Sequence, residues 1–268
     1  MEPYWDLVKK IITESDLVLE ILDARLVELS RNEEVERLIK EVGRPLIFVV
    51  NKRDLVSKKV LKKQVKNLRK NGMVVFISAK NPREIKILLY IIKKVFKESG
   101  KRKINELKEH RFAKADIVVG VLGYPNVGKS SIINAIAHKK KAKVGKRAGT
   151  THGIHWIKAT NEIKLIDSPG VIPLSKEDEV RIGLIGARSA DLLKNPEKIA
   201  QAIIKLFLKT NKKGFEIVYK INIKNENINE IIEQIAKSKG FLLKKGLLDE
   251  YRTCLMIVKD WQEGRLRL

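Results

Sequence analysis

Short apolar runs recur along the first two thirds of the chain, and a more polar segment follows each of them. Such runs, rich in β-branched residues, are typical of strands that are buried on both faces of a parallel sheet. The pattern predicts strands at 17–22, 45–50, 73–77, 117–122 and 163–166. Apolar and polar residues alternate at 154–159, which predicts a half-exposed edge strand.

Helical periodicity lies between most of these runs, at 33–42, 58–71, 83–96 and 129–138. Strands that alternate with helices predict a doubly wound α/β fold with a mostly parallel, six-stranded sheet.

The pattern changes after Pro173, where strand signals nearly vanish. Helical periodicity is found at 178–193, 196–208, 229–239 and 248–261, and Pro196 suits a first helical turn. The stretch 215–223 alternates and is compatible with a short strand. We therefore predict two domains, residues 1–174 and a smaller helical domain at 175–268.

Composition narrows the class of protein. The chain has 268 residues and is 44% hydrophobic, which fits a folded globular protein. No apolar run approaches the length of a membrane span, and we expect no membrane partner. The single cysteine, Cys254, excludes an intrachain disulfide and favours a cytoplasmic location.

The charge points to a polyanionic partner. Lys and Arg number 56 against 32 Asp and Glu, so the formal net charge is +24. A lysine-rich composition that serves heat stability is the alternative, but it predicts roughly balanced Lys and Glu. The imbalance favours nucleic acid as a partner.

A phosphate-binding loop follows the predicted strand 117–122. Residues Gly123–Ser130 match G-x-x-x-x-G-K-[ST] and open a predicted helix, and a chance glycine-rich turn would not combine these features. We expect Lys129 to reach the β- and γ-phosphates and Ser130 to bind Mg²⁺. The candidate phosphate-binding residues are Gly123, Pro125, Asn126, Val127, Gly128, Lys129, Ser130 and Ser131.

Two further segments carry candidate metal and switch residues. In Asp167-Ser-Pro-Gly170, after the strand 163–166, Asp167 is expected to hold Mg²⁺ and the Gly170 N–H to sense the γ-phosphate. Alone this pattern is usually a turn, but it gains weight downstream of a phosphate loop. Thr151 lies between the two motifs and is a candidate Mg²⁺ ligand; an ordinary loop hydroxyl is the alternative.

A base-specific site is predicted at the ends of two other strands. In Asn51-Lys52-Arg53-Asp54, the Asp54 carboxylate can accept hydrogen bonds from N1–H and N2–H₂ of guanine, a pair that adenine lacks. The Lys52 stem can lie along the base, and Asn51 can tie this loop to the phosphate loop. Backbone N–H groups of Ser78-Ala79-Lys80 can meet guanine O6. A surface turn is the alternative, but ligands bind at such strand ends in open α/β sheets.

The order of these motifs is permuted, because ordinary GTPases place the phosphate loop first. This order resembles the circularly permuted GTPases, most closely the RbgA/YlqF-type ribosome-assembly group, and the resemblance covers nearly the whole chain. Asp23-Ala-Arg25 followed by Arg31-Asn32 looks like that group's D-A-R … R-N segment. Residues 245–252 and 260–266 look like its helical domain.

The resemblance implies a GTPase that acts as a switch in assembly of the large ribosomal subunit, with GTP or GDP, Mg²⁺ and ribosomal RNA as ligands. Its implied catalytic residues are Asn126, Lys129, Thr151 and Gly170. In the group's relatives Asn126 looks like a K⁺ ligand; simple bracing of the loop is the alternative. We expect a monomer away from the ribosome.

Two departures predict slow intrinsic hydrolysis that a ribosomal partner stimulates; K⁺ is a candidate second stimulant through Asn126. Val171 stands where many small GTPases have a water-orienting Gln. The group's N-terminal F-P-G-H-M-like segment is missing, since no His precedes His110.

The permutation also has covalent consequences. Residues 97–116 must join the helix at 83–96 to the strand of the phosphate loop. The second switch, after Asp167, directly precedes the helical domain, so we hypothesise that the γ-phosphate reorients that domain.

Two clusters of cations are candidate RNA contacts, with a solvated charged face as the alternative. They comprise Lys58, Lys59, Lys62, Lys63 and Lys66, and Lys139, Lys140, Lys141, Lys143, Lys146 and Arg147. Two other functions stay open: an RNA-binding module in which GTP is structural and turnover negligible, and a GTPase that acts on tRNA or a translation complex.

Overall fold

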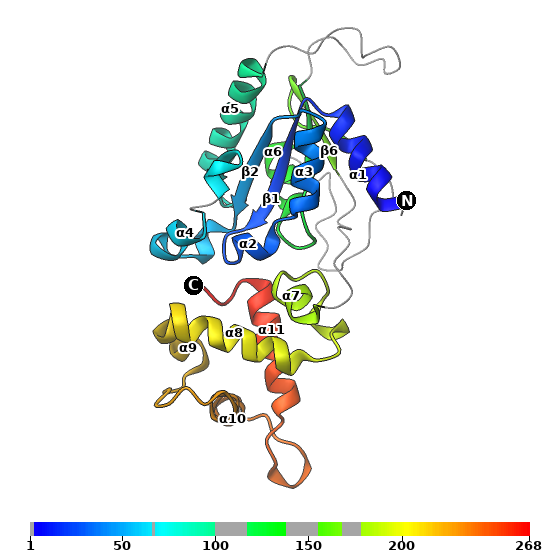
Figure 1. The fold of residues 1–268 in the computed structure, drawn as a ribbon. Coiled ribbons are helices and arrows are strands. Elements are labelled where there is room, and N and C mark those ends of the chain that lie inside the picture. The colour runs from blue at the N-terminus through cyan, green and yellow to red at the C-terminus, as the bar shows by residue number, and fades with distance from the viewer. Residues whose placement is uncertain (1–2, 66–67, 100–116, 138–154, 168–177) are drawn as a thin grey trace. The chain divides into compact units, whose positions relative to one another are not determined.

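The computed structural model describes residues 3–65, 68–99, 117–137, 155–167 and 178–268 (Figure 1). The chain divides into two compact units, Met1–Asp54 with Lys62–Pro173 and Leu55–Leu61 with Leu174–Leu268. The sequence does not predict that Leu55–Leu61 groups with the second unit. Two backbone hydrogen bonds account for it: Ser57 N–H donates to the Leu268 carbonyl (2.6 Å) and Leu268 N–H to the Leu55 carbonyl (2.8 Å).

The first unit is built on a six-stranded sheet of order β3-β2-β1-β4-β6-β5. Every neighbouring pair is parallel except β5, which runs antiparallel to β6 at the edge. The predicted doubly wound, mostly parallel sheet is therefore confirmed. The strands are β1 (Leu17–Asp23), β2 (Leu46–Asn51), β3 (Met73–Phe76), β4 (Ile117–Leu122), β5 (His155–Lys158) and β6 (Ile163–Asp167).

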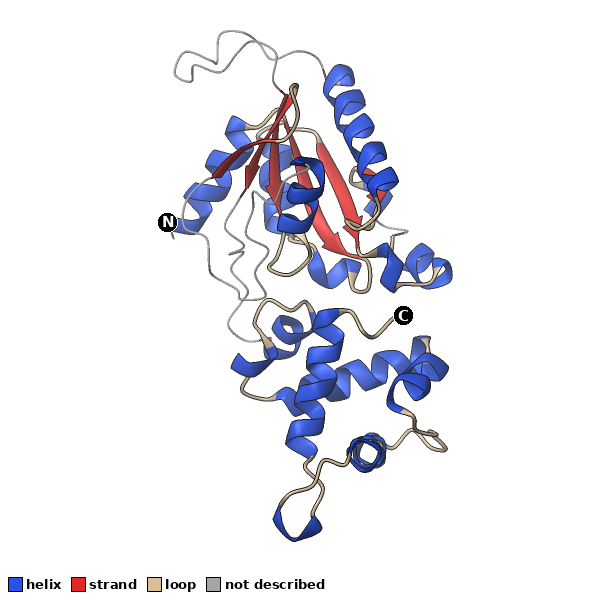
Figure 2. Cartoon of the chain, turned by 180° about the vertical axis from the view of Figure 1, so that it is seen from behind, coloured by secondary structure: helices blue, strands red, loops and turns tan. Residues whose placement is uncertain are grey.

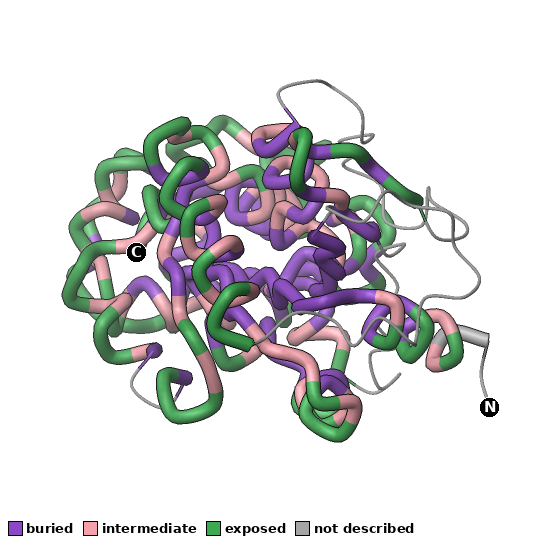
Figure 3. The backbone as a smooth tube through the Cα atoms, turned by 90° about the horizontal axis from the view of Figure 1, so that it is seen from above, coloured by how far each residue is buried: buried purple, intermediate pink, exposed green. Residues whose placement is uncertain are grey.

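Helices cover both faces of this sheet, and every residue of the central strands β1 and β4 is therefore buried. On one face α1 (Pro3–Glu14) and α3 (Glu33–Glu41) share an apolar cluster with β1, β4 and β6. Helices α5 (Pro82–Glu98) and α6 (Lys129–Ala137) pack against each other. Figure 2 gives the reverse view, and Figure 3 colours the buried residues purple.

Along residues 1–71 the structure differs from the sequence prediction in two places. Helix α1 was not predicted. The predicted helix at 58–71 is shorter, with α4 at Lys58–Gln64 and a separate 3₁₀ turn, η2, at Leu68–Lys70. Lysines recur at four-residue spacing past this point, at 62, 66 and 70, and like charges at that spacing disfavour a helix that continues beyond Gln64. Short turns α2 (Val27–Ser30) and η1 (Arg53–Leu55) follow β1 and β2.

The helical unit is confirmed as helical, but its first predicted helix, at 178–193, is shorter in the structure, and the open stretch at 215–223 contributes to a helix. Helix α7 covers only Glu179–Leu184, since Gly186 adopts a left-handed φ of 71° that ends it, and η4 follows at Ala190–Leu192. The ambiguous stretch forms helix α9 (Lys212–Tyr219), whose Phe215 and Tyr219 are buried four residues apart. The others are α8 (Pro196–Thr210), α10 (Ile228–Lys239), η5 (Lys244–Gly246) and α11 (Glu250–Glu263).

The core of this unit lies where α8 packs against α11. Phe207 meets Trp261 edge-on with ring centroids 6.1 Å apart, and the Trp261 indole donates to the Leu184 carbonyl (2.7 Å). Asp260 accepts hydrogen bonds from Tyr219 (3.1 Å) and Arg265 (2.7 Å). The segment 260–266 that resembles the family therefore secures α11 to its neighbours. No helix in the described ranges is long and apolar enough to cross a membrane.

Candidate nucleotide-binding site

The predicted site residues meet at one edge of the sheet. Because β1, β2, β3, β4 and β6 are parallel, their carboxyl ends lie along that edge. Asp23, Asn51 and Asp167 are the last residues of β1, β2 and β6, and Gly123 directly follows β4. Residues far apart in sequence are thereby brought to one edge of a single sheet.

The phosphate loop connects β4 to α6, as the motif requires. Gly123 and Gly128 have φ values of +144° and +104°, which favour glycine. A Cβ on Gly123 would lie 2.6 Å from the Ile21 carbonyl oxygen, and one on Gly128 would run into the Asn51 amide. The loop therefore needs glycine at both positions for backbone shape and for space.

Lys129, at the start of α6, is buried and faces its own loop. Its Nζ donates to the carbonyls of Gly123 (2.6 Å) and Tyr124 (2.8 Å). Burial lowers the pKa of Lys129 to about 8, although the charge of Asp167 opposes that shift. The ammonium thus lies beside the loop in which we expect the phosphates to bind.

Asp167 offers the carboxylate that a metal needs. Its Oδ1 is buried and has no hydrogen-bond partner within the described ranges. Burial raises the pKa of Asp167 to about 6, against the charges of Lys129 and His155. A buried oxygen without a donor fits a nearby cation, so Asp167 suits Mg²⁺, which takes few protein ligands when phosphates supply the rest. Ser130 stays the second predicted ligand from the sequence motif.

Asn51 links the loop expected to recognise the base (residues 51–54, the base-recognition loop) to the phosphate loop (residues 123–130). Its side chain is buried, and the amide nitrogen donates to the Val127 carbonyl (2.9 Å). Its Oδ1 accepts a hydrogen bond from Ala79 N–H (3.1 Å). Asn51 therefore makes the predicted tie to the phosphate loop and also holds the Ser78–Lys80 segment.

The groups proposed to meet guanine differ in availability. Asp54 is exposed, and among the residues described its carboxylate makes no hydrogen bond or ion pair, although it lies near enough to the Lys52 ammonium to affect it electrostatically. Ser78 N–H donates to Glu84 Oε2 (2.6 Å) and Ala79 N–H to Asn51, so Lys80 carries the N–H of this segment that is without a partner among described residues.

Glu84 was not singled out from the sequence. Besides accepting from Ser78 N–H, its carboxylate pairs with Arg53 (2.8 Å) and so joins the two segments expected around guanine. An acidic residue in the first turn of α5 is too common a feature to have identified it.

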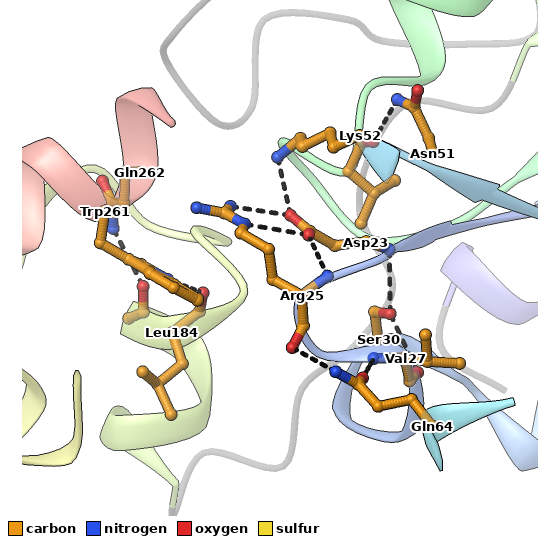
Figure 4. A network of polar contacts seen from close by, with 12 residues as sticks. Asp23, Arg25, Val27, Ser30, Asn51, Lys52, Gln64, Leu184, Trp261 and Gln262 are labelled. Atoms are coloured by element: carbon orange, nitrogen blue, oxygen red, sulfur yellow. Dashed lines mark hydrogen bonds and ion pairs between the residues drawn. The ribbon is translucent and has the colours of Figure 1, made fainter. Parts of the chain in front are cut away.

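Lys52 is anchored to the end of β1 (Figure 4). Its Nζ lies 2.8 Å from Asp23 Oδ2, and Arg25 binds the same carboxylate through Nε (3.0 Å) and Nη2 (2.8 Å). Burial alone would raise the pKa of Asp23, but the charges of Arg25 and Lys52 hold it well below its usual value. The D-A-R segment therefore lies directly beside the base-recognition loop.

Arg31 and Asn32, the second half of the D-A-R … R-N pattern, contact residues of α2, α3 and β1. Arg31 forms ion pairs with Glu28 (2.9 Å) and Glu36 (2.7 Å). Asn32 caps α3, donates its N–H to Glu20 (2.9 Å) and lies 3.4 Å from the Tyr124 hydroxyl of the phosphate loop.

Several predicted residues fall outside the described ranges: Thr151, Gly170, Val171, Lys66, the cluster at 139–147 and most of the predicted join at 97–116. The remaining basic cluster, Lys58, Lys59, Lys62 and Lys63, is exposed on α4. Asn126 adopts a left-handed φ of 61° in the phosphate loop.

Comparison with known proteins agrees with this geometry. A family model described as 50S ribosome-binding GTPase matches residues 118–245. Ribosome biogenesis GTPase A of Bacillus cereus is 30% identical over 255 residues, which are 94% of this chain and 84% of that protein. The chain belongs to this family of ribosome biogenesis GTPases.

Other members of the family are longer than this chain. An uncharacterized GTP-binding protein of Methanocaldococcus jannaschii is 40% identical over 98% of the chain, which spans 66% of that protein. The guanine nucleotide-binding protein-like 3 homolog of Drosophila melanogaster is 29% identical over the whole chain, which spans 48% of it.

Solved structures of the family share the fold. GDP-bound YlqF superposes with a TM-score of 0.64 at 21% identity, over 96% of this chain and 94% of that one. GNP-bound YlqF from T. maritima gives 0.61 at 22% identity, over 98% and 95%. The circularly permuted P-loop GTPase fold expected from the motif order is thereby confirmed.

Proposed function

We propose that the chain binds GTP and GDP and hydrolyses GTP. The observation that carries this proposal is the double contact of Asn51, which brings the base-recognition loop, the phosphate loop and the Ser78–Lys80 segment together. Residues 1–174 are the nucleotide-binding domain in this proposal, and residues 175–268 contact RNA.

Within the site we assign Lys129 to the phosphates and Ser130, Thr151 and Asp167 to Mg²⁺. Held by these residues, Mg²⁺ would supply positive charge against the negative charge that develops on the phosphate oxygens during hydrolysis. Asp54 recognises guanine and Gly170 senses the γ-phosphate. Val171 has no hydrogen-bonding group for a water, so slow intrinsic turnover is expected, with Asn126 as the candidate K⁺ ligand.

The partner we propose is ribosomal RNA of a precursor of the large subunit. The matched family description, the names of the relatives and the net charge of +24 support this choice. Lys58, Lys59, Lys62 and Lys63 offer one exposed basic surface. In the helical unit, Lys244 and Lys245 lie in an exposed loop with Leu242, Leu243 and Leu247.

The hydrolysis test compares single-turnover rates in Na⁺ and in K⁺, with and without large-subunit precursors. We expect slow turnover in Na⁺, acceleration by K⁺ and further acceleration by the particle. Asn126→Gly keeps the left-handed backbone accessible while it removes the side chain, so it should abolish the K⁺ effect. Fast turnover of the protein alone in Na⁺ would contradict this proposal.

The partner test is co-sedimentation with ribosomal particles, with GDP or a GTP analogue. Analogue-dependent binding to large-subunit precursors is expected. Binding without any turnover would favour the RNA-binding module with structural GTP. Selective binding to tRNA or to translating ribosomes would favour a GTPase that acts on tRNA or on a translation complex.

The proposed switch after Asp167 has its own test. X-ray scattering profiles of the GDP and GTP-analogue forms should differ if the γ-phosphate reorients the helical domain. Identical profiles would remove the support for this coupling.

A further inference from the structure

Lys52 lies between a residue that hydrogen bonds hold in place and a residue that is exposed. Asn51 before it is held by two hydrogen bonds, and the exposed Asp54 follows two residues later. Lys52 has a backbone φ of 60°, a conformation that non-glycine residues adopt only when their surroundings hold it. Its side-chain ammonium pairs with Asp23 at 2.8 Å.

Asp23 is itself rigidly held. Besides its two contacts with the Arg25 guanidinium, Oδ1 accepts from the Arg25 N–H (3.0 Å), and the Asp23 N–H donates to Ser30 Oγ (3.1 Å). Asp23 and Arg25 are each 2% exposed. Asp23 lies opposite Asn51 in the sheet register, so the carboxylate sits beside the start of the base-recognition loop.

A residue of helix α4 also holds the turn that carries Arg25. The Arg25 carbonyl accepts a hydrogen bond from the Gln64 side chain (2.9 Å), whose oxygen accepts from Val27 N–H (2.8 Å) (Figure 4). The turn that carries Arg25 is therefore fixed from both sides, and Lys52 is paired to a group that cannot move with it.

We propose that Asp23 is a positioning residue for guanine recognition: by holding the Lys52 ammonium, it keeps the stem of that lysine in place for the base to pack against. This inference rests on the proposed nucleotide binding. A free lysine samples many rotamers, and ordering one during binding weakens affinity. The ion pair orders Lys52 before the nucleotide arrives.

The experiment is a double-mutant cycle on affinity for a fluorescent GDP analogue, with Asp23→Asn, Lys52→Met and the combined variant. We expect each single variant to raise Kd about tenfold, mainly through faster dissociation. The combined variant should bind no more weakly than either single one. Independent losses that multiply, or unchanged affinity in Asp23→Asn, would overturn the inference.

Two further variants separate positioning from folding. Asp23→Asn leaves the buried Arg25 without its partner, so Asp23→Asn with Arg25→Gln tests the same loss without a stranded charge and should show the same tenfold effect. Glu36→Gln breaks the comparable Arg31–Glu36 pair and should leave affinity unchanged.

The outcome for the wild type distinguishes the two proposals. If the wild-type protein does not bind GDP, the proposed function fails and this inference fails with it. If it binds GDP and the Asp23 variants bind equally well with intact thermal unfolding, the inference alone fails.

Discussion

The side-chain amide of Asn51 donates a hydrogen bond to the main-chain carbonyl of Val127 across 2.9 Å. One residue belongs to the loop expected to recognise the base and the other to the loop expected to hold the phosphates. A single buried side chain therefore sets the spacing between the two halves of the predicted nucleotide site.

Asn51→Ala is expected to weaken the binding of both GTP and GDP by about tenfold or more, because it leaves the Val127 carbonyl and the Ala79 N–H without their partner. The free energy of unfolding should fall by about 1–3 kcal/mol. Titration with a fluorescent nucleotide and urea unfolding measure the two effects. Asn211→Ala, which removes two hydrogen bonds in the helical unit, should leave affinity unchanged.

Asp54→Asn should reverse the preference for the base. An amide cannot accept both guanine donors, but its N–H can donate to the carbonyl that xanthine carries at C2. We expect a large loss of affinity for GDP, on the order of a hundredfold or more, and a gain for xanthosine diphosphate. Competition binding measures both. Unchanged GDP affinity would remove Asp54 from the base site; Asp6→Asn, on the exposed side of α1, is the control.

Glu20→Gln should flatten the pH dependence of stability. Burial, and then the charge of Glu36, raise the pKa of Glu20 in the folded state, against the Asn32 N–H and Arg31. A carboxyl group whose pKa is raised by folding stabilises the protein at low pH. That contribution is lost as the pH rises from the unfolded-state pKa, about 4.3, through the folded-state value.

Wild type and Glu20→Gln should therefore be about equally stable near pH 4 and diverge above it, with the variant more stable at pH 7 by on the order of 1 kcal/mol. Urea unfolding across this pH range measures the difference. Glu98→Gln, at an exposed position, should follow the wild type throughout. A constant offset between Glu20→Gln and wild type at every pH would contradict the expected titration.

Replacing Lys58, Lys59, Lys62 and Lys63 with Gln should weaken RNA binding and make it less dependent on salt. If each lysine neutralises one phosphate, the slope of log K against log salt falls by up to about four. Filter binding to ribosomal RNA at several salt concentrations measures the slope. The control replaces Lys9, Lys40, Lys86 and Lys97, which are exposed elsewhere, and an equal loss there would point to net charge alone.

The sequence by itself determined the features that are local. The glycines and the lysine of residues 123–130 need only a strand before them and a helix after them. The apolar runs alone predicted the parallel strands whose carboxyl ends carry the motifs. The order of the motifs predicted the permuted fold, because that order can be seen directly in the sequence.

Tertiary structure decided what depends on residues far apart in the chain. The pattern at 215–223 fits both a strand and a helix until Phe215 and Tyr219 are buried together on one face of α9. The Asn51 contact to Val127, the Glu84 contacts to Arg53 and Ser78, and the Asp23 pair with Lys52 join separate strand ends. Their partners are set by the register of the sheet, which no local pattern encodes.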